Sequence, residues 1–382
     1  MSSPRLAVVM AFSGAGGVER MVLNLLAGLQ AEGPSELAID LIPIRAGNLP
    51  RERVPEGVRV VDLGLRHSTL AARALAGYLR RERPDAVLTA KDRAIRATVS
   101  ARRLAGVETR IVGRLGTNLS AALAGQGALR RWLRQAPMRR LYRDVDAIVA
   151  VSEGVAEDTR AITGLPAGRV LVVRNPVVTP ELAMQAQAPV DHPWLQPGAE
   201  VPVILGAGRL TRQKDFPTLI RAFATLRRHR PARLVILGEG GERGALERSI
   251  AELGLGDDVA LPGHQKNPWA WMARASLFVL SSAWEGSPNV LTEAIACGTP
   301  VVATDCPSGP RELLEDGRYG HLVPVGDAAA LAEAMHRTLE APLPAETLRE
   351  AAAEYTVAAS ARGYLQTLRL AQAEAERSPL GD

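Results

Sequence analysis

The chain has 382 residues, of which 47% are apolar, and its 46 basic and 41 acidic residues give a formal net charge of +5. This length suits two domains of ordinary size, and the composition is that of a folded globular protein. No apolar stretch approaches the ~18 residues of a membrane-spanning helix, so the sequence predicts none. Two cysteines argue against a disulfide framework and favour a reducing cytoplasm, and with scattered histidines they form no metal-ligand cluster.

Positive charge is concentrated in the first half of the chain. Residues 1–180 hold 27 Arg and Lys against 16 Asp and Glu, a net of +11, whereas residues 181–382 hold 19 against 25, a net of −6. A basic half favours a partner with negative charge, such as a phosphate, a nucleic acid or an anionic membrane surface. Because 43 of the 46 basic residues are Arg, compositional bias explains the choice of Arg over Lys but not this asymmetry.

Strand-like and helix-like segments alternate along the chain, which predicts an α/β fold with parallel sheets covered on both faces. In the first half, strands are expected near residues 6–11, 37–43, 58–61, 86–89, 109–113, 146–150 and 170–173, with helices at 17–31, 70–82 and 92–105. We assign residues 1–178 to a first Rossmann-like domain. Residues 179–200 are rich in Pro and Ala and lack periodicity, and we interpret them as a linker.

A second alternating series occupies residues 201–355 and predicts a second Rossmann-like domain. Its helices are expected at 216–229, 242–253, 267–274, 288–297, 327–340 and 345–373. The last part of the chain, residues 356–382, could fold back as a helix on the first domain. Two doubly wound domains are a common way to hold a nucleotide and a second substrate, and ligands bind beyond the carboxyl ends of the strands. The informative loops should therefore follow strands.

The loop after the first strand places Gly16 and Gly17 at the start of a helix. Consecutive glycines let backbone amides approach an anion closely. The pattern is neither G-x-G-x-x-G nor a P-loop. A phosphate contact and a tight turn without a ligand are therefore equally good interpretations of these residues alone.

Two loops of the second half combine glycines with basic residues. The strand VPVILGAG leads into Arg209 and Lys214, which could both reach a diphosphate, one as a planar fork and the other as a point charge. Lys214 is one of only three lysines, which favours a specific role, although a solubilising surface role explains both residues equally well. Gly238 and Gly240 follow the next strand, where glycines more commonly form a simple turn than contact a ligand.

Residues 263–269, GHQKNPW, also follow a strand and could line a pocket for a nucleotide base. His264 or Gln265 would then lie near the edge of the ring. A lone histidine is more often structural, so both interpretations of His264 stay open.

Two carboxylates, Glu285 and Glu293, lie eight positions apart across a predicted turn-to-helix junction. Ser287 suits the N-cap and Pro288 the first helical position, so Glu285 precedes the helix and Glu293 lies about a turn and a half inside it. The backbone amides of residues 286–290, with the positive end of the helix dipole, offer an anion site between them. Such a site suits a phosphorylated ligand whose hydroxyl groups contact carboxylates.

Residues 127–144 form a basic segment that carries six arginines interleaved with Trp132, Leu133 and other apolar residues. Three of these arginines are Arg130, Arg131 and Arg134. The pattern predicts either an element that lies on anionic lipid or one that grips a pyrophosphate, with an ordinary Arg-rich surface helix as the alternative.

The loops fall in one order, GGVER, GAGRLTRQKD, LGEG, GHQKNPWAWM, EGSPNVLTEAIACGTPVV and TDCPSGPRELL. This order closely resembles the retaining glycosyltransferases of family 4, whose GT-B fold has two doubly wound Rossmann-like domains facing a central cleft. The resemblance covers most of residues 5–340 and is densest at 203–326. Its specific element is the combination of E-x7-E, at Glu285 and Glu293, with R-x4-K, at Arg209 and Lys214.

By this resemblance the second domain binds a nucleotide-sugar donor, and the acceptor approaches from the first. Arg209 and Lys214 would neutralise the donor diphosphate, Glu285 would contact hydroxyls of the transferred sugar, and Glu293 would accept hydrogen bonds from the ribose. Arg209, Lys214 and Glu285 are therefore the expected catalytic residues. The other implied donor-binding residues are Gly16, Gly17, Gly238, Gly240, His264, Asn267, Gly286, Ser287, Pro288, Asn289 and Val290.

The charge that develops on the leaving diphosphate would be stabilised by Arg209, Lys214 and helix-terminal amides, which do the work of a divalent metal in other transferases. Asp144 and Asp146 superficially resemble a metal-binding D-x-D motif. They precede a strand, however, and a solvated turn is the better interpretation. We therefore expect neither a metal requirement nor a cofactor.

The resemblance has one departure. Many family members carry a histidine near the sugar in the first domain, but the corresponding loop of this chain reads IVGRLGTNLS. The only histidine of the first domain is His67, which is expected to be exposed. Arg114 and Asn118 could position the acceptor, although neither is a good base. The departing phosphate would then accept the acceptor's proton.

The resemblance implies transfer of a hexosyl or N-acetylhexosaminyl group from a UDP-sugar, with GDP-mannose as the second candidate donor. The acceptor would be a sugar or a polyprenyl-diphosphate-linked glycan used in polysaccharide or glycolipid assembly. We expect peripheral association with the anionic inner face of the cytoplasmic membrane, and no nucleic-acid partner. Two alternatives are a nucleotide-sugar hydrolase or epimerase of similar build and a non-catalytic nucleotide-sugar-binding partner subunit.

Overall fold

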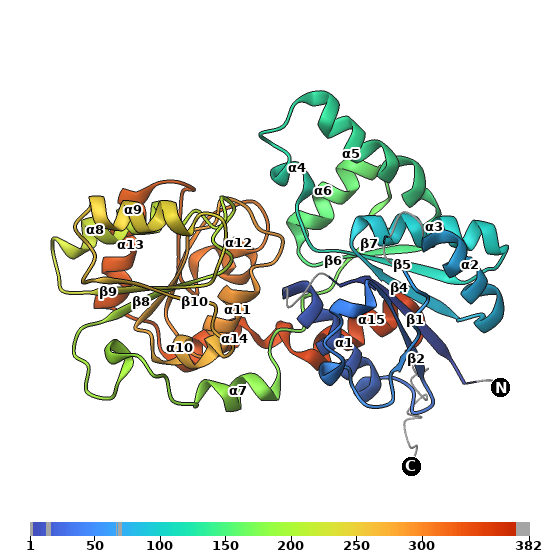
Figure 1. The fold of residues 1–382 in the computed structure, drawn as a ribbon, viewed down its shortest axis with the longest axis horizontal. Helices are drawn as coiled ribbons and strands as arrows, with labels where there is room; N and C mark the ends of the chain where they lie inside the picture. Colours follow the sequence, from blue (N-terminus) through green and yellow to red (C-terminus); the bar gives the residue numbers. More distant parts are fainter. Residues whose placement is uncertain (1–2, 13–16, 66, 68–70, 372–382) are drawn as a thin grey trace, which may run out of the picture. The chain divides into compact units, whose positions relative to one another are not determined.

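The computed structural model describes residues 3–12, 17–65, 67 and 71–371 and divides the chain into two compact units. Unit 1 comprises Met1–Val151, Val155–Pro176 and Val357–Asp382, and unit 2 comprises Ser152–Gly154 and Val177–Thr356. Each unit is built on one parallel sheet with helices on its two faces (Figure 1). Among the described residues, no helix is long and apolar enough to cross a membrane.

The sheet of unit 1 has the strand order β3-β2-β1-β4-β5-β6-β7, and every pair is parallel. The strands are β1 (Arg5–Ala11), β2 (Ala38–Ile44), β3 (Arg59–Val60), β4 (Ala86–Ala90), β5 (Arg110–Leu115), β6 (Ala147–Ala150) and β7 (Val170–Val172). The chain runs outward from β1 to β3 and then returns to the other side of β1 for β4. The order therefore reverses between β1 and β4, where doubly wound sheets bind ligands beyond the carboxyl ends of the strands.

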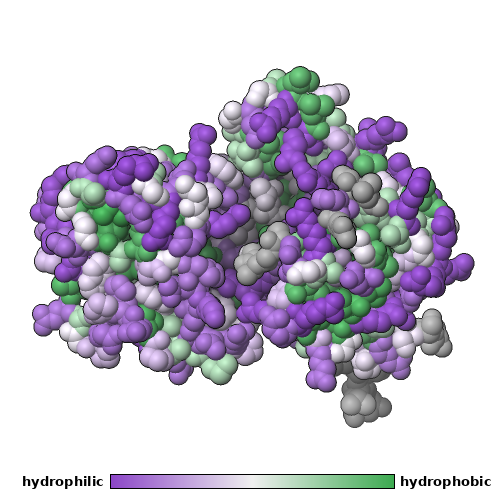
Figure 2. All heavy atoms as spheres, in the orientation of Figure 1, coloured by the Kyte–Doolittle hydropathy of each residue, from purple (hydrophilic) through white to green (hydrophobic). Residues whose placement is uncertain are grey.

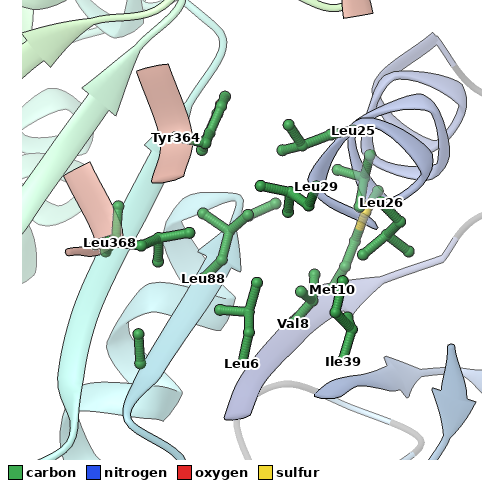
Figure 3. Packing of buried hydrophobic residues seen from close by; sticks show 14 of the residues in the cluster. Leu6, Val8, Met10, Leu25, Leu26, Leu29, Ile39, Leu88, Tyr364 and Leu368 are labelled. Atoms are coloured by element: carbon green, nitrogen blue, oxygen red, sulfur yellow. The ribbon is translucent and has the colours of Figure 1, made fainter. Parts of the chain in front are cut away.

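The helices of unit 1 are α1 (Gly17–Glu32), α2 (Ala71–Glu82), α3 (Asp92–Ala105), α4 (Leu119–Ala122), α5 (Ala128–Leu141), α6 (Glu153–Thr163) and α15 (Val357–Leu368). Alternate residues of β1 enter different cores, because successive side chains of a strand point to opposite faces. Leu6 and Val8 pack with α1 and α15, whereas Val9 packs with α2 and α3. Figure 3 shows side chains of α1 and α15 gathered over this first face of the sheet.

The contact between α1 and α15 depends on a small residue. A Cβ atom added at Gly28 of α1 would lie 2.6 Å from Cγ1 of Val357 on α15. Glycine at this position thus lets the two helices approach closely, so that Tyr364 and Leu368 reach the core formed by Leu25 and Leu29 (Figure 3).

A buried carboxylate joins the first three strands of unit 1. Asp40 of β2 is 1% exposed and accepts hydrogen bonds from Arg59 Nε at 2.7 Å, Tyr78 Oη at 2.5 Å and Arg5 Nη1 at 3.1 Å. Burial acts to raise the pKa of Asp40, but the hydrogen bonds from Arg59 and Tyr78 outweigh it and hold the pKa below its ordinary value. All of its partners are structural, so we assign this cluster to stability.

The sheet of unit 2 has the strand order β10-β9-β8-β11-β12-β13, again entirely parallel, and reverses between β8 and β11. Its strands are β8 (Val203–Ala207), β9 (Arg233–Leu237), β10 (Val259–Gly263), β11 (Leu277–Leu280), β12 (Val301–Thr304) and β13 (His321–Val323). Its helices are α7 (Pro180–Ala186), α8 (Phe216–Arg227), α9 (Arg243–Glu252), α10 (Pro268–Arg274), α11 (Asn289–Ala296), α12 (Pro310–Leu313), α13 (Ala328–Glu340) and α14 (Ala345–Ala351).

The segment expected to be a linker, residues 179–200, is structured and lies in unit 2. It contains α7, and its Leu182 and Leu195 are buried, with 2% and 6% exposure. Asn267, at the start of α10, donates from Nδ2 to the backbone oxygen of Gln185 at 2.8 Å. The aperiodic sequence therefore gives no sign of this short helix, which is stabilised by packing and by this side-chain hydrogen bond.

The helix expected over residues 345–373 is also different. It divides into α14 and α15, separated by a 3-10 turn at Ala353–Tyr355. Tyr355 is 4% exposed, and its backbone oxygen accepts from the amides of both Val177 and Val178 at 2.9 Å. These contacts explain the break, because they use a carbonyl group that a continuous helix would need.

Candidate functional site

The reversal point of the sheet in unit 2 brings together one lysine and one glutamate. Lys214 ends the loop after β8, and Glu285 lies in the loop after β11. Nζ of Lys214 is 2.5 Å from Oε1 of Glu285, and the two side chains are only 16% and 7% exposed. The second basic residue of R-x4-K and the first carboxylate of E-x7-E, 71 positions apart in the sequence, thus form one buried ion pair.

Further donors hold the Glu285 carboxylate in place. Ser282 Oγ donates to Oε1 at 2.7 Å, and Gln213 Nε2 lies 3.5 Å from Oε2. Thr304, at the end of β12, donates from Oγ1 to the backbone oxygen of Ser282 at 2.6 Å. A buried carboxylate needs such donors, and here they fix its orientation before any ligand arrives.

The Lys214 loop is tied to the Glu285 loop by several hydrogen bonds. Gln213 donates from Nε2 to the backbone oxygen of Trp284 at 2.9 Å and accepts from the amide of Ala283 at 2.8 Å. Ser281 Oγ donates to the backbone oxygen of Lys214 at 2.8 Å. The two loops therefore form a single preorganised surface at the carboxyl ends of β8 and β11.

The two cysteines of unit 2 take no part in this chemistry. Burial, with the nearby Glu285 carboxylate as a second cause, raises the pKa of the Cys306 thiol to about 12. Burial likewise raises the pKa of Cys297 to about 12. Both are therefore neutral thiols at pH 7.

Gly238 and Gly240 allow two loops of unit 2 to touch through their backbones. A Cβ atom at Gly238, whose φ is +136°, would lie 1.9 Å from the carbonyl oxygen of Gly208, and one at Gly240 would lie 2.3 Å from that of Leu210. The amide of Leu210 in turn donates to Glu239 O at 2.9 Å. The structure thus assigns these glycines a packing role beside Lys214, while their predicted contact with a donor remains a prediction.

Arg209 and His264 are both exposed at the carboxyl edge of the sheet. Arg209 begins the loop that ends in Lys214, so this loop carries one solvent-exposed cation and one buried cation. His264 follows β10, and Asn267 caps α10 by accepting from the amide of Ala270 at 3.3 Å. Both polar atoms of the Asn267 side chain are therefore hydrogen-bonded, the oxygen to α10 and the nitrogen to α7.

The helix after Glu285 begins one residue later than predicted. α11 starts at Asn289 with Pro288 in the N-cap position, and no side chain caps it, so the prediction that Ser287 is the N-cap is wrong. Pro288 has φ −78° and ψ +81°, and this turn leaves Ser287 outside the helix. Glu293 lies inside α11 and is 1% exposed. Gly286, Ser287 and Pro288 precede the helix, Asn289 and Val290 are its first two residues, and their predicted contacts with a donor remain predictions.

Unit 1 contains the other predicted positions. Gly16 lies outside the described residues, and Gly17 is the exposed first residue of α1. Arg114 of β5 is 3% exposed and donates from Nη2 to Asn175 Oδ1 at 2.6 Å. Asn118 caps α4 by accepting from the amide of Ala121 at 2.9 Å. Arg114 and Asn118 thus have partners inside unit 1, and their predicted contacts with an acceptor remain predictions.

Sequence reasoning overlooked Lys91, which lies at the reversal point of unit 1. It follows β4 directly, and its Nζ donates to Glu19 Oε1 at 3.2 Å and to Ala11 O at 3.0 Å. Its φ of +74° and ψ of +138° are rare for a residue with a side chain and cost on the order of 1–3 kcal/mol. The scarcity of lysine, which drew attention to Lys214, would have identified Lys91 as well.

The basic segment of residues 127–144 includes α5, whose apolar stripe faces solvent. Leu129, Trp132 and Leu133, spaced i, i+3 and i+4, are 71%, 56% and 58% exposed, whereas Met138 is 2% exposed. The neighbouring Arg130, Arg131 and Arg134 are exposed as well. Figure 2 shows hydrophobic and strongly hydrophilic surface side by side at the top of the view, over the region of α4 and α5.

The two carboxylates of the D-x-D motif are paired with arginines. Asp146 Oδ2 accepts from Arg102 Nη1 at 2.5 Å and from the amide of Ile111 at 2.7 Å, and Asp144 Oδ2 accepts from Arg103 Nε at 2.6 Å. Both carboxylates lie before β6, at the amino end of the sheet. They are ion-paired rather than simply solvated, and they lie away from the edge at which doubly wound sheets bind ligands.

Comparison with known proteins defines the class. The family model of the glycosyl transferases group 1 matches residues 192–356, and that of the glycosyl transferase 4-like domain matches residues 16–176. The lipopolysaccharide core biosynthesis glycosyltransferase LpsE of Rhizobium meliloti (strain 1021) is 30% identical over 328 residues, which are 84% of this chain and 85% of LpsE. The chain is a glycosyltransferase and belongs to the group 1 family.

A second relative is the N-acetylgalactosamine-N,N'-diacetylbacillosaminyl-diphospho-undecaprenol 4-alpha-N-acetylgalactosaminyltransferase of Campylobacter jejuni, 34% identical over 200 residues, 52% of each protein. The chain spans about half the length, or less, of two of the curated relatives it matches. The crystal structure of Anabaena HepE in complex with UDP and glucose is similar with a TM-score of 0.73 and 20% identity, over 95% of this chain and 99% of HepE. The fold is therefore GT-B, as predicted.

Proposed function

We propose that the protein is a retaining transferase that moves a hexosyl or N-acetylhexosaminyl group from a nucleotide-diphosphate sugar to a sugar or lipid-linked glycan. UDP is the favoured nucleotide, with GDP-mannose as the second candidate donor. The observation that carries the proposal is the buried Lys214–Glu285 pair at the reversal point of unit 2, with the exposed Arg209 on the same loop. The activities for which LpsE and the C. jejuni relative are named support lipopolysaccharide or polysaccharide assembly, and the UDP complex of HepE supports the nucleotide.

The charges of the site suggest how the donor is activated. Cleavage of the anomeric C–O bond puts negative charge on the departing diphosphate, which Arg209 and Lys214 stabilise in place of a metal ion. In the free protein Glu285 balances the charge of Lys214. Glu285 then accepts hydrogen bonds from hydroxyls of the transferred sugar, and Glu293 accepts them from the ribose. The leaving phosphate takes the proton of the acceptor.

Nucleotide binding is the first test. We expect UDP to raise the melting temperature in a thermal-shift titration more than GDP or ADP does. Glu293→Ala should weaken nucleotide binding ~10- to 100-fold, because one or two hydrogen bonds to a charged group are lost. Glu285→Ala should leave that affinity within a few-fold and slow transfer instead. Glu333→Ala, which removes an exposed carboxylate of α13, is the matched control.

Two results would contradict the donor-site assignment. One is that none of the three nucleotides raises the melting temperature, and the other is that Glu285→Ala and Glu293→Ala both have negligible effects. Tight donor binding by the purified chain without any transfer would instead favour the non-catalytic partner subunit. Release of free sugar as the main product would favour a hydrolase.

The α5 surface supports a second part of the proposal, that the enzyme works on the anionic inner face of the cytoplasmic membrane. Residues 109–143 contain no Asp or Glu, so every charged side chain of the segment that carries the exposed apolar stripe of α5 is positive. Apolar side chains that enter the headgroup region beside arginines that contact anionic lipid are typical of interfacial helices. This location would bring the enzyme to a lipid-linked acceptor.

Vesicle binding tests this part. The protein should co-sediment with vesicles that contain ~30% phosphatidylglycerol and bind far less to pure phosphatidylcholine, because each basic residue near an anionic surface adds about 1 kcal/mol. Replacing Arg130, Arg131 and Arg134 by glutamine should reduce binding ~100-fold by the same estimate. Trp132→Ser with Leu133→Ser should also reduce it, whereas the control pair Met184→Ser with Leu253→Ser, exposed on unit 2, should not. Equal binding to the two kinds of vesicle would contradict the proposal.

A further inference from the structure

Both sheets carry a lysine–glutamate pair at the point where their strand order reverses. In unit 2 the pair is Lys214 and Glu285, proposed above for the donor site. In unit 1 it is Lys91, directly after β4, and Glu19, in the first turn of α1 after β1. Two of the three lysines of the chain therefore lie at the two places where a doubly wound sheet binds its ligand.

In the pair of unit 1 the carboxylate is buried and the lysine is partly exposed. The Glu19 side chain is 4% exposed, whereas that of Lys91 is 37% exposed. Among the residues that the structure describes, Glu19 Oε1 and Ala11 O account for two of the three donors of the Lys91 ammonium group. The backbone of Lys91 adopts its unfavourable φ of +74° in the conformation that brings Nζ to these oxygens. The open side of the ammonium group lies at the carboxyl edge of the sheet.

We propose that Lys91, held in place by Glu19, donates a hydrogen bond to a hydroxyl group of the sugar acceptor. The inference rests on the proposed function, since only a transferase needs an acceptor site, and it names residues of that site. Because Glu19 balances the charge of Lys91, the pair is locally neutral and suits an uncharged ligand better than a phosphate. A hydroxyl group suits this position, because its oxygen can accept a hydrogen bond from the remaining donor of the Lys91 ammonium group.

The scarcity of lysine makes a direct test feasible. In the full-length chain labelled with ¹³C at Cε of lysine, Lys91, Lys214 and Lys266 give three side-chain NMR signals, which the single Lys→Arg variants assign. The probes are UDP, inorganic phosphate, and the methyl glycosides of glucose, galactose, N-acetylglucosamine and N-acetylgalactosamine. Each glycoside is titrated to ~50 mM, which nearly saturates a site with a Kd in the low millimolar range.

We expect at least one glycoside to move the Lys91 signal saturably, with the Lys214 and Lys266 signals unchanged and with phosphate inactive. Glu19→Gln should weaken that response at least tenfold, and unchanged Lys214 and Lys266 signals would show that the variant is folded. The inference is overturned if no glycoside moves the Lys91 signal of the unsubstituted protein, or if phosphate moves it instead. UDP should move the Lys214 signal, so a failure of the donor site would be seen separately.

Discussion

Replacing Lys214 by methionine should reduce the rate of glycosyl transfer by ~10²- to 10³-fold, the usual effect of removing one preorganised group that stabilises charge in a transition state. Lys214 is 16% exposed and contacts Glu285 at 2.5 Å, so its charge acts where water screens it poorly. The effect should appear in kcat at saturating donor. Arg228→Met, which removes an exposed cation at the end of α8 in the same unit, is the control and should keep full activity.

The same substitution also affects stability, and a double variant separates the two effects. Lys214→Met leaves Glu285 buried without its cation, which costs about 3–5 kcal/mol when one partner of a buried pair is removed. Lys214→Met combined with Glu285→Gln removes both charges and should recover most of the melting temperature, measured by circular dichroism. It should recover no activity. Recovery of transfer in the double variant would show that Lys214 acts only through folding.

Gly238→Ala should destabilise unit 2 by at least ~3 kcal/mol, which is exceptional for the addition of a single methyl group. The new Cβ atom would lie 1.9 Å from the carbonyl oxygen of Gly208, and the φ of +136° is itself unfavourable for alanine. Because the obstacle is backbone rather than a flexible side chain, the loops after β8 and β9 would have to separate. We therefore expect a lower melting temperature and loss of nucleotide binding together.

A nearby glycine provides the control for this prediction. A Cβ atom at Gly241 would meet no heavy atom within 4 Å, so Gly241→Ala should change the free energy of unfolding by less than ~0.5 kcal/mol. Chemical denaturation of both variants, with nucleotide affinity measured in parallel, distinguishes them. Similar behaviour of the two variants would show that the close approach of the loops at Gly238 is unimportant.

The pattern of strands and loops could be predicted from the sequence because it depends on local properties. Alternating hydrophobic periodicities located the strands of the first sheet and the alternation of elements in the second half, and doubly wound sheets place ligand-binding loops after strands. Arg209, Lys214, Glu285 and Glu293 were chosen on that basis. Besides the start of α11, two segments differ from their predictions, α7 and the break before α15. Both are short, and buried contacts such as those of Leu182 and Tyr355 decide their conformation.

The sequence by itself determined the class of fold, the glycosyltransferase family and the residues expected to meet a donor. Only the tertiary structure decided that Lys214 pairs with Glu285 and that Lys91 pairs with Glu19. It also decided that position 238 must be glycine, because the backbone of Gly208 leaves no room for a Cβ atom there. The physical reason is distance along the chain. Lys91 and Glu19 are 72 positions apart, and neither periodicity nor a local motif relates residues that meet only where the strand order of a sheet reverses.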